Sequence, residues 1–436
     1  MKKLLILIFF APSLLMAQPN GLTLAETRAA VLSANPSVRE SLQRIASAEA
    51  VLKQAHSAYL PTVSFAGSIG YMDVSVHPES DITNRYNDSM KQASGGLQAS
   101  WLLFDGFARE ARSLSAKYGL QQSRELADET RRLLILSATV SFRQAQLAMQ
   151  NIEVAEQDYA FNTNLEGDAQ KRFDVGMLPE ADVYNFSIRA LRAENSMLQT
   201  QLDYKIACAV LAELMALPDA QLSEGLRPVA AGFDLPGAVP ELDLELQYAL
   251  GNRPDYKAMQ SGRLALEQQV RAAKGDLLPK VALTGSMTYT ETEDRSVVEN
   301  YGDYDSFVGI TVKWDLFAGG RKINMVKQAQ AEMCALEDQQ EALRLSIRSV
   351  LRQRIDEAET ATEVFGRQKK IYELSTRVRD SIEKAYRAGA VSITRLNEAQ
   401  TDLVRARTGY ASSYIACQLV LNRLDIETGR VMKDVL

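Results

Sequence analysis

The strongest constraint on this chain is a pattern that occurs twice at nearly constant spacing. Leu60-Pro61 in the first half matches Leu278-Pro279 in the second. The segment Trp101-Leu102-Leu103-Phe104-Asp105-Gly106 matches Trp314-Asp315-Leu316-Phe317-Ala318-Gly319 at nearly the same offset in residue number. An offset that changes so little over most of the chain indicates a duplicated structural unit. The two copies are therefore predicted to share one fold.

Each copy contains a helical pattern of about 65 residues without a proline, from Phe107 to Phe173 and from Arg321 to Tyr386. At 1.5 Å per residue, each helix would be roughly 100 Å long, more than a compact domain uses. Gly176 and Gly389 follow, and glycine suits a left-handed C-cap. The sequence after each glycine has apolar residues three and four apart, the spacing of a coiled-coil seam. Each copy is therefore predicted to contain a long helical hairpin with a glycine at its tip.

Before each long helix the apolar period changes to two, which predicts strands. The outgoing strands are expected near 63–71 and 281–289, and the returning strands near 97–103 and 308–316, with polar loops near 75–90 and 291–305. Strands of about ten residues can cross a bilayer when tilted. An ordinary hairpin on a soluble core is the alternative, but the flanking helices are too long to cover so small a sheet. The predicted membrane-interface aromatics are Tyr71, Trp101, Tyr289 and Trp314.

The predicted organisation has five parts. Residues 1–17 form a secretory signal peptide, with Lys2-Lys3 before a short apolar run and Ala17 at the cut. Residues 18–217 are the first repeat and 241–428 the second, each a short helix, a second helix, a β-hairpin and the long helical hairpin. A linker rich in proline and glycine occupies 218–240, and a C-terminal tail occupies 429–436.

Composition excludes several functions. The formal charge is −6, and removal of Lys2 and Lys3 makes it −8, which argues against a nucleic-acid partner. His56 and His77 are the only histidines and have no partners at metal or triad spacing. No P-loop, G-x-S-x-G or dinucleotide fingerprint is present. We therefore predict no enzymatic activity, no metal and no cofactor.

The three cysteines, Cys208, Cys334 and Cys417, have no metal spacing, although an exported protein could oxidise a pair. Cys208 and Cys417 end the same Ile-Ala-Cys triplet in the two copies. The favoured interpretation is that they are small apolar residues at helix interfaces.

Four membrane strands cannot close a barrel, and open strand edges are not tolerated in lipid. Copies of the chain must therefore complete the sheet. Two chains would give eight strands with a filled interior, whereas three would give twelve, wide enough to begin holding water.

The signal peptide, the duplicated helix–hairpin–helix order, the proline-punctuated helix starts and both glycine tips resemble the TolC family of outer-membrane efflux proteins. The resemblance covers nearly the whole mature chain and implies an α+β membrane protein, a homotrimer. Its long helical hairpins would form an α-barrel in the periplasm, and four strands from each chain would build a 12-stranded transmembrane β-barrel. It also implies a passive exit duct in the outer membrane of a Gram-negative bacterium, of the kind used in tripartite efflux or type I secretion. The implied partners are a periplasmic adaptor, or membrane fusion protein, an inner-membrane transporter and outer-membrane lipid.

The resemblance also assigns candidate site residues. The adaptor-docking tips would be Gly176, Met177 and Leu178 on the first hairpin, and Gly389, Ala390 and Val391 on the second. The periplasmic gate would comprise Asp182, Tyr386, Arg395 and Glu398. Family members often carry acidic residues at the last two positions. Arg395 departs from this pattern, so a ring of Arg395 beside Glu398 is expected to be self-neutralising rather than a cation-binding constriction.

The main alternative is a periplasmic coiled-coil adaptor or structural protein without a pore. Such a protein would share the long hairpins and the heptads. It would normally contain one hairpin rather than two, and no alternating strands of membrane length.

Overall fold

The computed structural model describes residues 21–76, 86–222, 240–294 and 300–434. These residues form two compact units. We call residues 21–41, 127–254 and 344–434 the hairpin unit, and residues 42–126 and 255–343 the sheet unit. Each unit draws segments from both copies of the repeat, so the duplication in the sequence does not correspond to two separate bodies.

Four helices enter the sheet unit, two from each repeat: α2 (Pro36–Ser57), α3 (Ala108–Asp174), α6 (Pro254–Gly275) and α7 (Arg321–Arg387). Helices α2 and α6 begin on prolines, which fit the first helical position because no amide is needed there. Both helices end shortly before Tyr59 and Leu277, where the sequence pattern predicts their ends. The intervening residues form turns, in which the amides of Tyr59 and Leu277 bond the carbonyls of His56 and Lys274.

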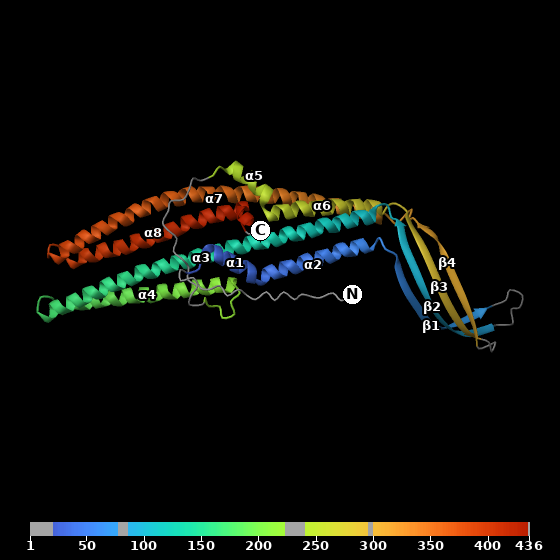
Figure 1. Ribbon diagram of the computed structural model, residues 1–436, viewed down its shortest axis with the longest axis horizontal. Helices are drawn as coiled ribbons and strands as arrows, with labels where there is room; N and C mark the ends of the chain where they lie inside the picture. Colours follow the sequence, from blue (N-terminus) through green and yellow to red (C-terminus); the bar gives the residue numbers. More distant parts are fainter. Residues whose placement is uncertain (1–20, 77–85, 223–239, 295–299, 435–436) are drawn as a thin grey trace, which may run out of the picture. The chain divides into compact units, whose positions relative to one another are not determined.

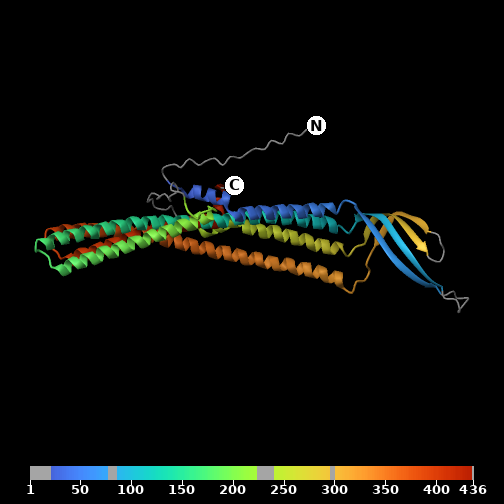
Figure 2. The same cartoon turned by 90° about the horizontal axis from the view of Figure 1, so that it is seen from below.

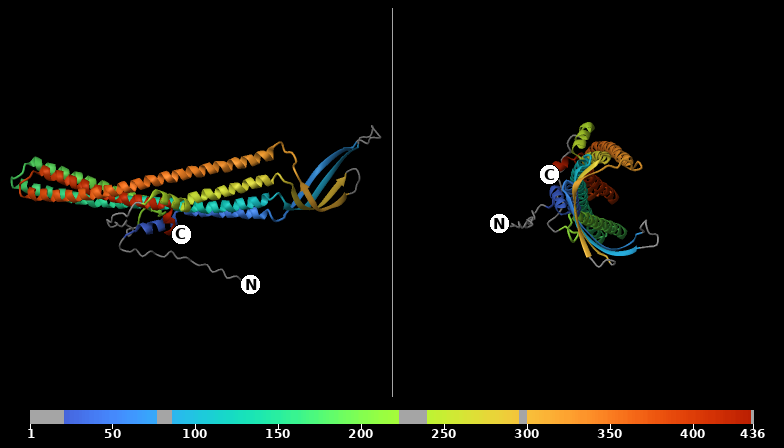
Figure 3. Two further views of the ribbon diagram at one scale, coloured as in Figure 1. Left: turned by 90° about the horizontal axis from the view of Figure 1, so that it is seen from above. Right: turned by 90° about the vertical axis from the view of Figure 1, so that its right-hand side faces the viewer.

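One antiparallel sheet carries the four predicted strands in the order β1 (Thr62–Val76), β2 (Tyr86–Phe104), β3 (Lys280–Asp294) and β4 (Asn300–Lys313). Figure 3 shows its twist. The predicted length of about ten residues is wrong, because the strands contain 14 to 19 residues. The predicted loops are correspondingly too long: strand pairing extends to Val76↔Tyr86 and Glu293↔Asn300. Backbone pairing continues there because ladder hydrogen bonds do not require apolar side chains.

The apolar residues of the strands share one face of the sheet. Phe65 pairs with Leu97 and Leu97 pairs with Met287, so these three side chains form one cross-strand row. All three are more than half exposed. A row of this kind on an extended sheet requires an apolar environment, since soluble monomers rarely expose large contiguous apolar patches.

The hairpin unit consists mainly of two helical hairpins that lie side by side, α3 with α4 (Glu180–Leu214) and α7 with α8 (Ile393–Thr428) (Figures 1 and 2). The predicted seams are largely buried: Val183, Phe186, Ala190 and Ala193 in α4, and Leu396, Ala399, Leu403, Ala406 and Cys417 in α8. Cys417 is therefore the apolar interface residue that the sequence predicts. Cys208 is half-buried and Cys334 exposed, and all three cysteines are free.

Two short helices and the C-terminal turn pack against the base of these hairpins. Helix α1 (Leu24–Ala34) begins with a capping box in which Thr23 and Glu26 bond each other's backbone amides. Helix α5 (Leu242–Asn252) contacts α8, as does the 3₁₀ turn η1 (Arg430–Asp434). Val431 and Met432 of this turn are buried with Ile135 and Ile426. Within the described part of the chain, no helix combines the length and the apolar character needed to cross a membrane.

Candidate functional site: the helical tips and the supports of the channel

Both tips end their first helix in the same way. Gly176 has a φ of 76° and Gly389 a φ of 75°. In the first tip the Gly176 amide bonds the Phe173 carbonyl, and the next amide reaches back to the Arg172 carbonyl. The amides of Gly389 and the residue after it make the same two bonds in the second tip. This is the Schellman arrangement, which satisfies the last carbonyls of a helix and needs a left-handed residue at the turn.

The tips expose apolar side chains. Met177 is 78% exposed and Val175 66% exposed. Leu178 and Val391 are half-buried, while Gly389 and Ala390 are exposed. No atom lies within 4 Å of the position that a Cβ would take on either tip glycine. The space beside each glycine backbone is therefore open to another molecule.

The four predicted gate residues occupy the turns just beside the tips, but they do not form one cluster. Arg395 Nη1 lies 3.2 Å from Glu398 Oε2, and both side chains are more than half exposed. Tyr386 lies beneath the guanidinium of Arg172, with 5.4 Å between Cζ and the ring centroid. Among the described residues, the half-buried Asp182 carboxylate forms no ion pair.

Arg172 was not selected from the sequence, although it lies in the first arm, close to Gly176. Its contact with Tyr386 joins the first hairpin to the second, because Arg172 ends α3 and Tyr386 ends α7. A guanidinium over an aromatic face is attracted to the ring by about 0.5–1 kcal/mol at an exposed site. The tip of one hairpin thus holds the gate tyrosine of the other.

Polar side chains link the two hairpins further along their length. Gln400 Nε2 donates to Asp158 Oδ1 at 2.9 Å, and Arg407 Nη2 donates to Glu153 Oε1 at 2.8 Å. Both pairs join α8 to α3. Sequence reasoning missed them because charged and amide residues are frequent on all four helices, and no period selects which will meet.

An aromatic cluster packs α7 against α8. The Tyr410 ring stacks on Phe365 at 5.5 Å and on Tyr372 at 5.4 Å between centroids. Burial raises the pKa of Tyr410, and neighbouring Tyr372, Glu373 and Tyr414 raise it further. The phenol is therefore held in its neutral form, as a stacked and partly buried ring should be.

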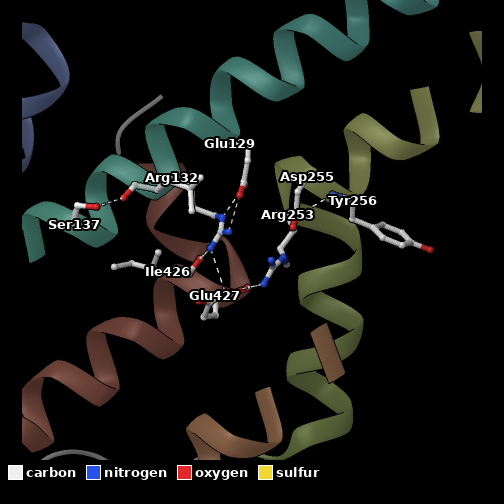
Figure 4. Close-up of polar contacts among 9 residues, drawn as sticks. Glu129, Arg132, Ser137, Arg253, Asp255, Tyr256, Ile426 and Glu427 are labelled. Atoms are coloured by element: carbon white, nitrogen blue, oxygen red, sulfur yellow. Dashed lines mark hydrogen bonds and ion pairs between the residues drawn. The ribbon is translucent and has the colours of Figure 1, made fainter. Parts of the chain in front are cut away.

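At the base of the hairpins, Glu427 receives two arginines (Figure 4). Arg132 Nη1 lies 3.2 Å from Glu427 Oε2 and Arg253 Nη1 lies 2.8 Å from it. Arg132 also bonds both oxygens of Glu129. The guanidinium side chains are at most 7% exposed. Burial at this depth is tolerated only because each charge is paired and hydrogen-bonded.

Four aromatic residues mark two levels along the sheet. Trp101 Nε1 donates to the Tyr59 carbonyl at 2.9 Å, and Trp314 Nε1 donates to the Leu277 carbonyl at 3.1 Å. Each tryptophan therefore ties a strand end to the end of the preceding helix, with the same partners in both repeats. Tyr71 is exposed, and Tyr289 contacts Tyr304 with 4.8 Å between ring centroids. These tyrosines lie nearer the other end of the ladder.

The register gives the separation of the two levels. Tyr71 pairs with Lys91, ten residues from Trp101 on β2. At about 3.3 Å per residue, ten residues span about 33 Å along the strand. A strand tilted by about 40° would then place the two levels about 25 Å apart, close to the apolar band of outer-membrane proteins.

The fold and these sites agree with known proteins. Residues 28–217 and 246–419 match the family model described as outer membrane efflux protein. The chain belongs to this family. The match spans both repeats, which include both helical hairpins.

Among the curated outer membrane efflux proteins and their relatives, Nodulation protein T of Rhizobium leguminosarum bv. viciae is 25% identical over 409 residues, 90% of this chain and 78% of its own. Outer membrane protein TolC of Salmonella enteritidis is 24% identical over 414 residues, with the same coverage of 90% and 78%.

Solved channels show the same fold. The CmeC outer membrane channel of Campylobacter jejuni has a TM-score of 0.79 at 15% identity and covers 93% of this chain and 85% of its own. The outer membrane protein VceC of Vibrio cholerae has a TM-score of 0.76 at 16% identity, covering 93% and 96%.

Membership of the family confirms the predicted fold class, location and function. The protein is an outer-membrane efflux channel of the kind that operates in tripartite systems, with its helical part in the periplasm. The alternative of a pore-free adaptor is not favoured, because the match includes both repeats and a four-stranded sheet is present. The family is one of channels rather than enzymes. Among the described residues, no group of three potential ligands gathers to hold a metal ion.

Proposed function

We propose that three copies of this chain form the channel. The sheet order leaves β1 and β4 as edges, and unpaired edges are not tolerated in lipid. Joining β4 of one copy to β1 of the next satisfies both edges. Three copies of a four-stranded sheet then give twelve strands, enough for a water-filled interior.

Unpartnered apolar stripes on the hairpins support this assembly. On α4 the exposed residues Ile188, Leu191, Leu198 and Leu202 follow heptad spacing. On α7 the exposed residues Val364, Ile371, Leu374 and Val378 do the same. These stripes are separate from the buried seams of their own hairpins. Neighbouring copies, with one stripe facing the other, would bury both.

The channel conducts substrate passively from an inner-membrane transporter to the exterior, and a periplasmic adaptor joins the two. The tips are the adaptor-docking surface: Met177 and Leu178 supply apolar contact, and Gly176 and Gly389 allow close approach. Ala390 and Val391 complete the surface on the second hairpin. The described residues that carry this proposal are the exposed apolar neighbours of two open glycine turns.

Asp182, Tyr386, Arg395 and Glu398 form the periplasmic gate. The 3.2 Å approach of Arg395 to Glu398 supports a locally neutralised ring. Tyr386 is pre-positioned by Arg172, so its hydroxyl is available to Asp182 of a neighbouring hairpin. The signal peptide at 1–17 and most of the linker at 218–240 lie outside the described residues and stay predictions, as does the division into two repeats. His77 also lies outside them, and no enzymatic activity or cofactor is proposed.

Single-channel conductance in a planar bilayer tests this function. Wild-type protein should give a low-conductance channel, and Asp182→Ala and Tyr386→Phe should widen it. Tyr184→Phe is the matched control, because the Tyr184 hydroxyl bonds Glu180 of its own helix at 2.6 Å and the change should leave conductance unaltered. An open wild-type pore that neither gate variant alters would retain the duct and reject the gate. Folded protein that forms no channel would reject the duct.

A further inference from the structure

A small basic cavity opens in the sheet unit where β3 begins and β4 ends. Its volume is about 260 Å³, and five cationic side chains line it: Arg112, Lys280, Lys313, Arg321 and Lys322. These residues come from α3, from both strands and from the start of α7. A cavity of this size can hold a phosphate-sized group.

Two carboxylates neutralise only part of this charge. Asp276 pairs with Arg112 at 2.5 Å and with Lys280 at 2.9 Å, and Asp315 pairs with Lys322 at 3.2 Å. Five cations against two anions leave a net charge of +3. Lys313 and Arg321 are both exposed and form no ion pair with any described residue. The cavity therefore retains a net attraction for an anion.

The first repeat shows that the fold does not require these cations. The positions that correspond to Lys280, Lys313 and Arg321 in the first repeat are Thr62, Ser100 and Ala108. Only Lys322 has a cationic counterpart, Arg109. That guanidinium is already engaged, since it donates to the carbonyls of Ala58 at 3.1 Å and Leu102 at 2.6 Å. Three cations are thus present in one copy of a duplicated structure without a structural need that the other copy shares.

The surroundings of the cavity indicate the ligand. Trp314 follows Lys313 directly, at the level where aromatic residues meet the membrane surface. Leu316 and Phe317, in the turn that leads to Arg321, are 79% and 89% exposed. Cations beside exposed apolar side chains at a strand end match a phospholipid, whose phosphate is anionic and whose chains are apolar.

We propose that this cavity binds the phosphodiester headgroup of an anionic phospholipid from the periplasmic leaflet. Lys313 and Arg321 contact the phosphate, while Leu316 and Phe317 lie against its acyl chains. The inference rests on the location of the sheet in the outer membrane and on neither the proposed trimer nor the proposed gate.

Native mass spectrometry of the full chain in detergent, titrated with phosphatidylglycerol or phosphatidylcholine, tests the proposal. Wild type should retain phosphatidylglycerol in preference to phosphatidylcholine. Each lysine or arginine near an anionic lipid surface contributes about fivefold to affinity, so Lys313→Gln with Arg321→Gln should weaken phosphatidylglycerol binding about 25-fold. The matched control is Lys327→Gln, an exposed lysine of the same helix outside the cavity, and it should bind as wild type does.

Further arms separate the alternatives. Lys313→Arg with Arg321→Lys retains the charge and should restore binding. Equal retention of both lipids by wild type, or an equal loss in Lys327→Gln, would overturn the proposal. A site that inorganic phosphate fills at millimolar concentration, with no preference for phosphatidylglycerol, would identify a free-anion site instead. Helical circular dichroism and channel conductance of the double variant should equal those of wild type, so failure of this inference is distinguishable from failure of the proposed channel.

Discussion

Arg253 Nη1 lies 2.8 Å from Glu427 Oε2 and also donates to the Glu427 carbonyl at 3.0 Å. The first repeat contains the same relationship in neutral form. Asn35 Nδ2 donates to the Leu214 carbonyl at 3.0 Å. Asn35 and Arg253 both precede a helix-starting proline, and Leu214 and Glu427 occupy matching positions in the two repeats. In both repeats, the residue before the proline therefore ties the short helix to the end of the returning long helix.

This pair of ties gives a prediction with an internal control. Arg253→Met should destabilise the hairpin unit by about 3 kcal/mol, because one member of a buried ion pair is removed. Asn35→Ala removes one neutral hydrogen bond and should cost about 1 kcal/mol. The measurement is the guanidinium midpoint of the helical circular dichroism signal in detergent. Equal losses in the two variants would show that the charge of Arg253 adds nothing.

Gly106 and Gly319 occupy matching positions with different surroundings. Both have positive φ, 70° and 57°. A Cβ on Gly106 would overlap the Gly275 carbonyl oxygen and lie 2.9 Å from Leu278 Cβ, whereas nothing lies within 4 Å of a Cβ on Gly319. Gly319→Ala should therefore cost only backbone strain, about 1–2 kcal/mol.

Gly106→Ala should cost about 3 kcal/mol or more, because overpacking adds about 1–3 kcal/mol to the same strain. Heat denaturation of the two purified variants, followed by circular dichroism, compares them directly. If Gly319→Ala proved as harmful as Gly106→Ala, the close backbone approach would not be the cause.

The exposed stripe on α4 predicts how assembly fails. Leu198→Glu places a charge in the interface that we propose between copies, and should convert trimers to monomers because an unpaired buried charge costs several kcal/mol. Gln199→Glu adds the same charge at the neighbouring exposed position, about 100° around the helix, and should remain trimeric. Analytical ultracentrifugation in detergent reports the oligomeric state. A trimeric Leu198→Glu variant would remove this stripe from the interface.

Asp276 predicts a pH dependence of the sheet unit. Burial raises the pKa of Asp276, but hydrogen bonds from Lys280 and Arg112 and the charges of both residues outweigh burial, so the pKa lies below its usual 3.8. A carboxyl whose folded pKa is depressed stabilises the fold above its unfolded pKa, and that contribution is lost as pH falls through the folded value. Asp276→Asn should therefore be less stable than wild type at pH 6.

Below pH 3.8 the difference between Asp276→Asn and wild type should shrink toward zero. Denaturation midpoints of both proteins between pH 6 and pH 2 give this difference, and other carboxylates affect the two proteins alike. A difference independent of pH would show that the Asp276 charge does not contribute.

Much of the fold follows from the sequence alone. The two long helical patterns, the glycine tips, the four strands and the buried seams were all predictable, because helical period, strand period and left-handed caps are properties of a few neighbouring residues. The duplication strengthened each prediction, since every element had to fit two segments. Strand ends were not predictable, because pairing between backbones extended the ladder past the apolar alternation, as at Val76↔Tyr86.

The tertiary structure decided which polar residues meet. The sequence placed Arg395 near Glu398, since side chains at i and i+3 on one helix are always neighbours. It did not reveal that Arg172 covers Tyr386, that Arg253 and Arg132 share Glu427, or that Lys313 and Arg321 line one cavity. Nearly a quarter of the residues are charged, and many pairings satisfy the same local pattern. Only the folded backbone, by bringing together residues far apart in the chain, determines which of those pairings form.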